Sequence, residues 1–111
     1  MHFTTGLQKN KEFAAVYEKG KSKADKFLVF YVLENNSSKN RIGVSVSKKV
    51  GNSVVRHRLK RLIKESYRCN EFKFKDGYDI VFIARKGAVD QSYKTIEHSL
   101  IHLASQMGVI S

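Results

Sequence analysis

The hydrophobic pattern changes its period within residues 41–68. Ile42, Val44 and Val46 alternate with polar or small residues, so this part predicts a half-buried strand over 41–47. From residue 52 the apolar positions recur at helical spacing instead, at Val55, Leu59, Leu62 and Ile63. Asn52 can cap this helix, because its short side chain accepts from free backbone N–H groups. We therefore expect a strand, a short turn and a helix over 52–68 with one apolar face.

Four further elements follow from the same patterns. A first helix begins with Asn10 as its cap and stops at Gly20, and a final helix is capped by Asp90 or Ser92. Residues 26–34 and 78–84 are almost continuously apolar, as strands covered on both faces are. The polar tract 35–40 predicts an antiparallel hairpin between strands 26–34 and 41–47. The pattern also allows a short extra strand near Ser22.

These elements predict one α+β domain over residues 1–111, since no repeat or linker divides the chain. Its order is α-β-β-α-β-α, a sandwich with a mixed, mainly four-stranded sheet. Strand 41–47, helix 52–68 and strand 78–84 would form a β-α-β crossover, and such crossovers are nearly always right-handed.

Charge adds a second property to the helix over 52–68. The chain carries 21 Lys and Arg against 10 acids, a formal net charge of +11. On this helix Arg56, Lys60 and Lys64 repeat at i, i+4 and i+8 without an acid between them on that face, and like charges at this spacing repel. A solvated surface is the simple alternative. The pattern favours a polyanion, with nucleic acid the leading candidate, because phosphates would neutralise the repulsion.

Catalytic chemistry is not indicated by the sequence. His98 and His102 are four residues apart near Glu97, but a third metal ligand and the HExxH order are missing, so no metal site is predicted. The single cysteine, Cys69, fits a reducing compartment, and no segment has the length and hydrophobicity of a membrane helix. We expect a cytoplasmic protein without catalytic residues of its own.

One stretch resembles a known signature. Arg41-Ile42-Gly43-x-Ser45-Val46-Ser47-Lys48-Lys49-x-Gly51-Asn52-x-Val54-x-Arg56-x-Arg58-x-Lys60-Arg61 resembles that of the bacterial ribonuclease P protein subunit, and the order of elements is similar over nearly the whole chain. His57 departs from the pattern, because the family usually has Asn between the two arginines. The resemblance implies a ribosomal protein S5 domain 2-like fold with a left-handed β-α-β crossover.

The resemblance also implies two sets of binding residues. The residues expected to dock on the catalytic RNA subunit are Lys48, Lys49, Asn52, Arg56, His57, Arg58 and Arg61. Those expected to hold the single-stranded 5′ leader of precursor tRNA are Phe13, Tyr17, Tyr31, Ser45, Lys60 and Lys64. Without the resemblance, Phe13 would be assigned to the core rather than to a binding cleft.

The function implied is that of the RNA-binding subunit of ribonuclease P. This protein would assist endonucleolytic removal of the 5′ leader, while the RNA subunit and its Mg²⁺ ions carry the hydrolysis. The partners would be the RNA subunit and precursor tRNA, with no obligatory protein partner, no membrane and no cofactor bound by the chain. The alternative is a stand-alone RNA-binding module of ribosomal-protein type, for which charge and aromatic content would be the same.

Overall fold

A computed structural model describes residues 4–7 and 9–110. Its elements are β1 (Thr4–Gly6), α1 (Asn10–Lys19), β2 (Lys21–Ala24), β3 (Leu28–Glu34), β4 (Asn40–Ser45), α2 (Ser53–Asn70), η1 (Glu71–Lys73), β5 (Tyr78–Ala84), η2 (Lys86–Ala88) and α3 (Tyr93–Gln106). The α+β class is confirmed, and so are β2 near Ser22 and the end of α1 at Gly20. The short β1 was not predicted, because three residues, two of them threonine and one glycine, carry almost no periodic signal.

Strand β5 lies in the middle of a sheet with the order β1-β4-β5-β3-β2. It pairs parallel with β4 and antiparallel with β3, so the predicted hairpin between β3 and β4 is wrong. The physical reason is burial: Ile80, Val81 and Phe82 are all fully buried, and this requires a strand on each edge of β5 as well as cover on both faces. The connection over residues 35–39 therefore passes over the end of β5.

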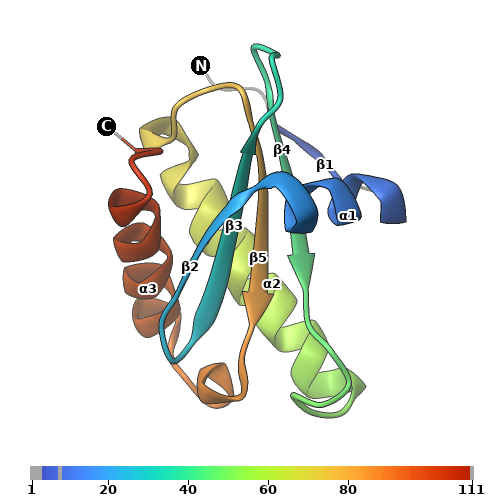
Figure 1. Cartoon of the computed structure of the whole chain (residues 1–111). Helices are drawn as coiled ribbons and strands as arrows, with labels where there is room; N and C mark the ends of the chain where they lie inside the picture. The colour runs from blue at the N-terminus through green and yellow to red at the C-terminus, as the bar shows by residue number, and fades with distance from the viewer. Residues whose placement is uncertain (1–3, 8, 111) are drawn as a thin grey trace.

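The crossover from β4 through α2 to β5 has the left-handed sense. In Figure 1 both strands run downward, α2 returns upward behind the sheet, and β5 lies to the left of β4. The general rule favours the right-handed sense. The resemblance alone gave the correct handedness.

The sheet has helices on both faces (Figure 1). Alternate residues of β3, namely Leu28, Phe30 and Val32, are buried in the main core with the apolar faces of α2 and α3. On the other face a smaller core of Leu7, Val16 and Val81 holds α1 against the sheet. Helix α1 is therefore attached by few apolar contacts, and polar contacts have a larger share in fixing its position.

Side chains cap two of the three helices as the sequence predicted. Asn52 Oδ1 accepts from the Val55 N–H at 3.0 Å, and Ser92 Oγ, rather than Asp90, accepts from the Thr95 N–H at 3.2 Å. Asn10 is not the cap of α1 but its first helical residue. The cap position belongs to Lys9, whose backbone N–H donates to Glu12 Oε1 at 2.9 Å. A glutamate three residues into a helix can satisfy the cap N–H in this way.

Candidate nucleic-acid interface

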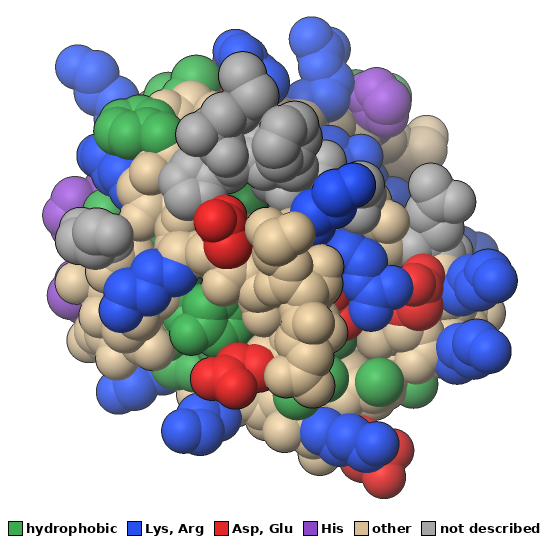
Figure 2. Space-filling view, turned by 90° about the horizontal axis from the view of Figure 1, so that it is seen from above, with side chains coloured by type: hydrophobic (Ala, Val, Ile, Leu, Met, Phe, Trp, Pro, Cys, Tyr) green, Lys and Arg blue, Asp and Glu red, His purple; other side chains and the backbone are tan. Residues whose placement is uncertain are grey.

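Helix α2 presents its cations to solvent along most of its length. Exposed positions are His57, Arg58, Lys60, Arg61, Lys64 and Arg68. The apolar side, with Leu59 and Ile63 fully buried, faces the core, so most cations of the face predicted from the sequence remain accessible to a partner. Figure 2 shows Lys and Arg side chains around most of the outline of the molecule seen from above, with acidic side chains in fewer places. Such an imbalance attracts polyanions.

Arg56 differs from its neighbours on this helix. Its side chain is half-buried, and its Nε atom is buried with no hydrogen-bond partner among the residues that the structure describes. Arg58 is exposed, and its Nη2 donates to the carbonyl oxygen of Gln91 at 2.9 Å. The two arginines are about 200° apart around the helix, so they face different surroundings.

A hollow of about 380 Å³ lies between α1 and α2, with β4 as its floor. Phe13 and Tyr17 come from α1, Ser45 from β4 and Lys60 from α2. An aromatic wall thus stands opposite a cation across a floor of Val44, Ser45 and Val46. This is the combination that proteins use for single-stranded nucleic acid, in which bases stack and phosphates need a counter-charge.

Phe13 and Tyr17 belong to a row of three rings, whose third member, Tyr31 of β3, lies outside the lining of the hollow. The Phe13 and Tyr17 ring centroids are 6.3 Å apart, and those of Tyr17 and Tyr31 are 5.0 Å apart with an edge-to-face arrangement. Burial raises the pKa of Tyr17 above its usual value of 10.0, although a hydrogen bond with Ser45 lowers it in part. The Tyr17 hydroxyl is therefore neutral at physiological pH and can donate a hydrogen bond.

Phe13 combines a packing role with a place in the hollow. It is half-buried and lies so close to β4 that a Cβ atom on Gly43 would be 2.5 Å from its ring. Gly43 therefore provides the space for the ring over the strand, and any larger residue would displace Phe13. Phe13 therefore packs against the smaller core and also lines the hollow. The sequence alone predicted the first of these positions and the resemblance predicted the second.

A second hollow of about 500 Å³ adjoins the first. The two share Phe13, Val44 and Lys60 in their linings, and the second continues past Lys64 to Arg68. Lys64, which the resemblance assigned to the leader site, therefore lies in this continuation rather than beside Tyr17. We call the two hollows together the α1–α2 cleft.

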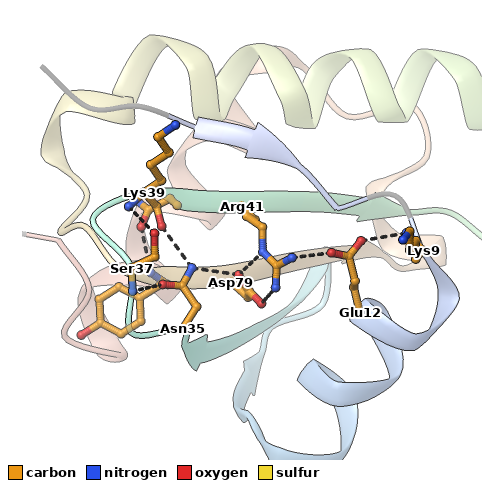
Figure 3. A network of polar contacts seen from close by, with 9 residues as sticks. Lys9, Glu12, Asn35, Ser37, Lys39, Arg41 and Asp79 are labelled. Atoms are coloured by element: carbon orange, nitrogen blue, oxygen red, sulfur yellow. Dashed lines mark hydrogen bonds and ion pairs between the residues drawn. The ribbon is translucent and has the colours of Figure 1, made fainter.

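A network of charged side chains fixes α1 at the rim of this cleft (Figure 3). Arg41 on β4 donates from Nε to Asp79 Oδ1 at 2.8 Å and also pairs with Glu12 on α1. Asp79 is buried on β5, and Asn35 Nδ2 donates to its Oδ1 at 2.9 Å. The carboxylates raise the pKa of Arg41, Asp79 most strongly, so the arginine remains charged. The network joins α1 to the neighbouring strands β4 and β5 through Glu12, the residue directly before Phe13.

The residues before α2 form a further basic region at the opposite end of the sheet. Lys48 and Lys49 are exposed in the turn, and a hollow of about 420 Å³ beside Lys49 is also lined by Lys26, Arg85 and Lys86. These last three were not predicted from the sequence. Their signal was weak, because Lys26 and the Arg85-Lys86 pair lie in two separate connections that only the folded sheet brings together.

Neither a metal cluster nor a membrane helix is present in the described part of the chain. Over residues 4–7 and 9–110, no three His, Cys, Asp or Glu side chains are placed to hold a metal ion. The rings of His98 and His102 stack at 6.2 Å. No helix among the described residues is long and apolar enough to cross a membrane.

Comparison with known proteins decides the family. A family model described as Ribonuclease P matches residues 1–108. The chain belongs to the ribonuclease P protein family. The ribonuclease P protein component of Alkaliphilus metalliredigens is 55% identical over 111 residues, with 100% of both chains covered. That of Clostridioides difficile is 50% identical, with 96% of this chain and 94% of that protein covered.

Solved structures of ribonuclease P proteins have the same fold. The Staphylococcus aureus RNase P protein superimposes with a TM-score of 0.87 at 36% identity, covering 96% of this chain and 97% of that one. The Thermotoga maritima RNase P protein gives a TM-score of 0.84 at 28% identity, covering 90% and 94%. Family membership assigns the chain to ribonuclease P and thus to tRNA processing within a ribonucleoprotein. The individual binding residues stay predictions.

Proposed function

We propose that this chain holds the 5′ leader of precursor tRNA in the α1–α2 cleft while it binds the RNA subunit of ribonuclease P. The observation that carries this proposal is that Phe13 and Tyr17 lie opposite Lys60 across β4. Tyr31 of β3 extends the aromatic row through its edge-to-face contact with Tyr17. Bases of a single strand can stack on the rings, and Lys60 and Lys64 can neutralise the phosphates between them. Ser45 on the floor can exchange hydrogen bonds with sugar or base.

The RNA subunit is proposed to bind the remaining cations of α2 and of the turn before it. This set is Lys48, Lys49, Asn52, Arg56, His57, Arg58 and Arg61. All of them except Arg56 are exposed, and Asn52 also caps α2, so a loss of binding on its replacement would include a structural part. Arginine suits such contacts because its planar fork binds phosphate in two places.

The proposed division of labour leaves the hydrolysis to the RNA subunit and its Mg²⁺ ions. The protein supplies binding: it lengthens the contact with the substrate and reduces the phosphate repulsion between two RNA molecules. No residue of the chain is assigned as catalytic, as a metal ligand or as a cofactor ligand. The proposed compartment is the cytoplasm, which fits the free, exposed thiol of Cys69.

Reconstitution tests this function. The purified chain is added to a bacterial ribonuclease P RNA subunit, and cleavage of precursor tRNA is measured at low Mg²⁺, where the RNA alone is slow. We expect the chain to restore cleavage at the mature 5′ end and to cut nothing by itself. A Lys94→Ala variant, which loses an exposed cation on α3 away from the cleft, serves as the control and should behave as the wild type.

A chain that binds RNA without restoring cleavage would be a stand-alone RNA-binding module, and the proposal would fail. Cleavage by the chain alone, in the absence of the RNA subunit, would contradict the division of labour.

A further inference from the structure

Another hollow, of about 470 Å³, lies on the opposite side of α2, between this helix and the start of α3. Leu62 of α2 and Tyr93 of α3 give it an apolar part. Arg58, Arg61, Lys64 and Arg68 surround it together with the acid Glu65, which pairs with Arg68. Its volume falls within the range of sites that take small organic groups. Leu62 and Tyr93 are half-buried, so both have surface left to contact a bound group.

Contacts within the protein hold the walls of this hollow in place. The Tyr93 hydroxyl donates to Glu97 Oε2 at 3.0 Å, which fixes the ring, and Arg58 Nη2 donates to the Gln91 carbonyl oxygen at 2.9 Å, two residues before Tyr93. On the far side Arg68 Nε donates to Glu65 Oε2 at 3.1 Å. A site with fixed walls loses little side-chain freedom when a ligand binds.

The chemistry of the lining selects the occupant. Glu65 also lines the pocket and pairs with Arg68, so three cations remain for a ligand. Three cations around an aromatic and an aliphatic side chain suit a group that is flat and apolar in the centre and anionic on both sides. A nucleotide extruded from an RNA strand has this form, since its base can stack while its flanking phosphates meet the cations. A phosphate alone would leave Leu62 and Tyr93 unused, and an apolar peptide would leave the cations unpaired.

We infer that this hollow, which we call the α2–α3 pocket, receives one unstacked nucleobase of the ribonuclease P RNA subunit, with the Tyr93 ring as its stacking surface. The inference rests on the proposed function and deepens it, because Arg58 and Arg61 were assigned to the RNA subunit only as phosphate contacts. Lys64 borders both the α1–α2 cleft and this pocket, so α2 separates a substrate strand on one side from the RNA subunit on the other.

Tyr93 variants test the inference through RNA-subunit affinity and its salt dependence. Tyr93→Phe keeps the ring, whereas Tyr93→Leu keeps apolar volume without an aromatic face. We expect Tyr93→Phe to bind the RNA subunit as the wild type does. Tyr93→Leu should bind about 5- to 150-fold more weakly with an unchanged log–log salt slope, since stacking releases no counterions. Arg61→Ala, the control, should weaken binding and make the slope shallower.

An RNA subunit with single abasic nucleotides, introduced one position at a time, then locates the base. One abasic position should weaken binding of the wild type and have no additional effect on Tyr93→Leu. The inference is overturned if Tyr93→Leu binds as tightly as the wild type, if its salt slope changes as that of Arg61→Ala does, or if no abasic position is coupled to Tyr93. Failure of the wild-type chain to bind the RNA subunit at all would instead refute the proposed function.

Discussion

At the scale of single residues, Arg56 is the cation of α2 whose surroundings differ most from those of its neighbours. Its Nε is buried and has no partner among the described residues, and an unsatisfied buried donor costs about 1–3 kcal/mol. The sequence placed this arginine on the cationic, solvent-facing side of the helix. Helical periodicity gives the direction of a side chain but not the neighbours that cover its base, so this burial was not predictable.

Replacing Arg56 by a residue with a similar stem separates stability from binding. We expect the free energy of unfolding of Arg56→Met in urea to equal or exceed that of the wild type, because a poorly satisfied polar group is removed. RNA-subunit affinity should fall, with a log–log salt slope shallower by about 0.7 to 0.9 for each phosphate that the protein no longer neutralises. Arg58→Ala is the matched variant on an exposed position and should also bind more weakly at nearly unchanged stability.

A clear loss of stability in Arg56→Met would show that the guanidinium is structural, and unchanged RNA affinity in both variants would remove this face from the interface.

At the scale of elements, the charged network sets the position of α1, and this position was not predictable. Arg41, Asp79 and Glu12 come from three elements that are far apart in the sequence. The sequence identified α1 and placed Phe13 and Tyr17 on one side of it, because that information is local. The side of the sheet on which α1 lies depends on contacts that only the assembled sheet provides.

Removal of Arg41 should be far more costly than removal of a surface cation. In Arg41→Ala the buried Asp79 loses its charged partner but keeps the hydrogen bond from Asn35. Because the Arg41 side chain is 36% exposed, we expect the free energy of unfolding in urea to fall by about 2–3 kcal/mol, less than for a fully buried pair. Arg68→Ala is the control, because Arg68 and its partner Glu65 are both exposed, and solvent screens such a pair so that its loss should change stability little.

Adding Asp79→Asn to Arg41→Ala should restore part of the loss, since the unpaired charge disappears. Equal stability of Arg41→Ala and Arg68→Ala would show that the network does not hold α1.

At the scale of the whole molecule, the sequence predicted the class and most elements but not the pairing of the strands. The tract 35–40 has the composition of a hairpin loop, and a hairpin is the commonest solution for two neighbouring strands. The strand that separates them, β5, follows more than thirty residues later. Non-local pairing of this kind is set by the burial of β5. The local pattern near residues 35–40 therefore cannot predict that β5 lies between β3 and β4.

The candidate site was predictable to a similar degree. The cations of α2 and the turn were visible as a run, and the resemblance selected the aromatic residues. The cations Lys26, Arg85 and Lys86 and the wall residue Tyr93 were missed, because only the tertiary structure brings them beside the basic helix.

The division of labour between protein and RNA is tested at His57. Histidine is the commonest general acid or base, and this one is exposed in the middle of the basic helix. If its role is hydrogen bonding, asparagine can replace it, because both side chains offer a donor and an acceptor. We expect the holoenzyme with His57→Asn to keep most of its cleavage rate at saturating Mg²⁺. Loss of cleavage with RNA affinity intact would mean that the protein takes part in the chemistry.

The central claim is that the aromatic row of the α1–α2 cleft holds the leader. Tyr17 is the best probe, because it is 39% exposed and its replacement should leave the fold intact. The measurement compares the affinity of the reconstituted holoenzyme for precursor tRNA with a leader and for mature tRNA, with wild type, Tyr17→Phe and Tyr17→Ala.

We predict that Tyr17→Ala weakens binding of the precursor by about 1–3 kcal/mol and leaves binding of mature tRNA unchanged, because a stacked base contributes about that much. Tyr17→Phe, which keeps the ring, should retain most of the precursor affinity. An equal loss for precursor and mature tRNA, or no loss for either, would contradict the account.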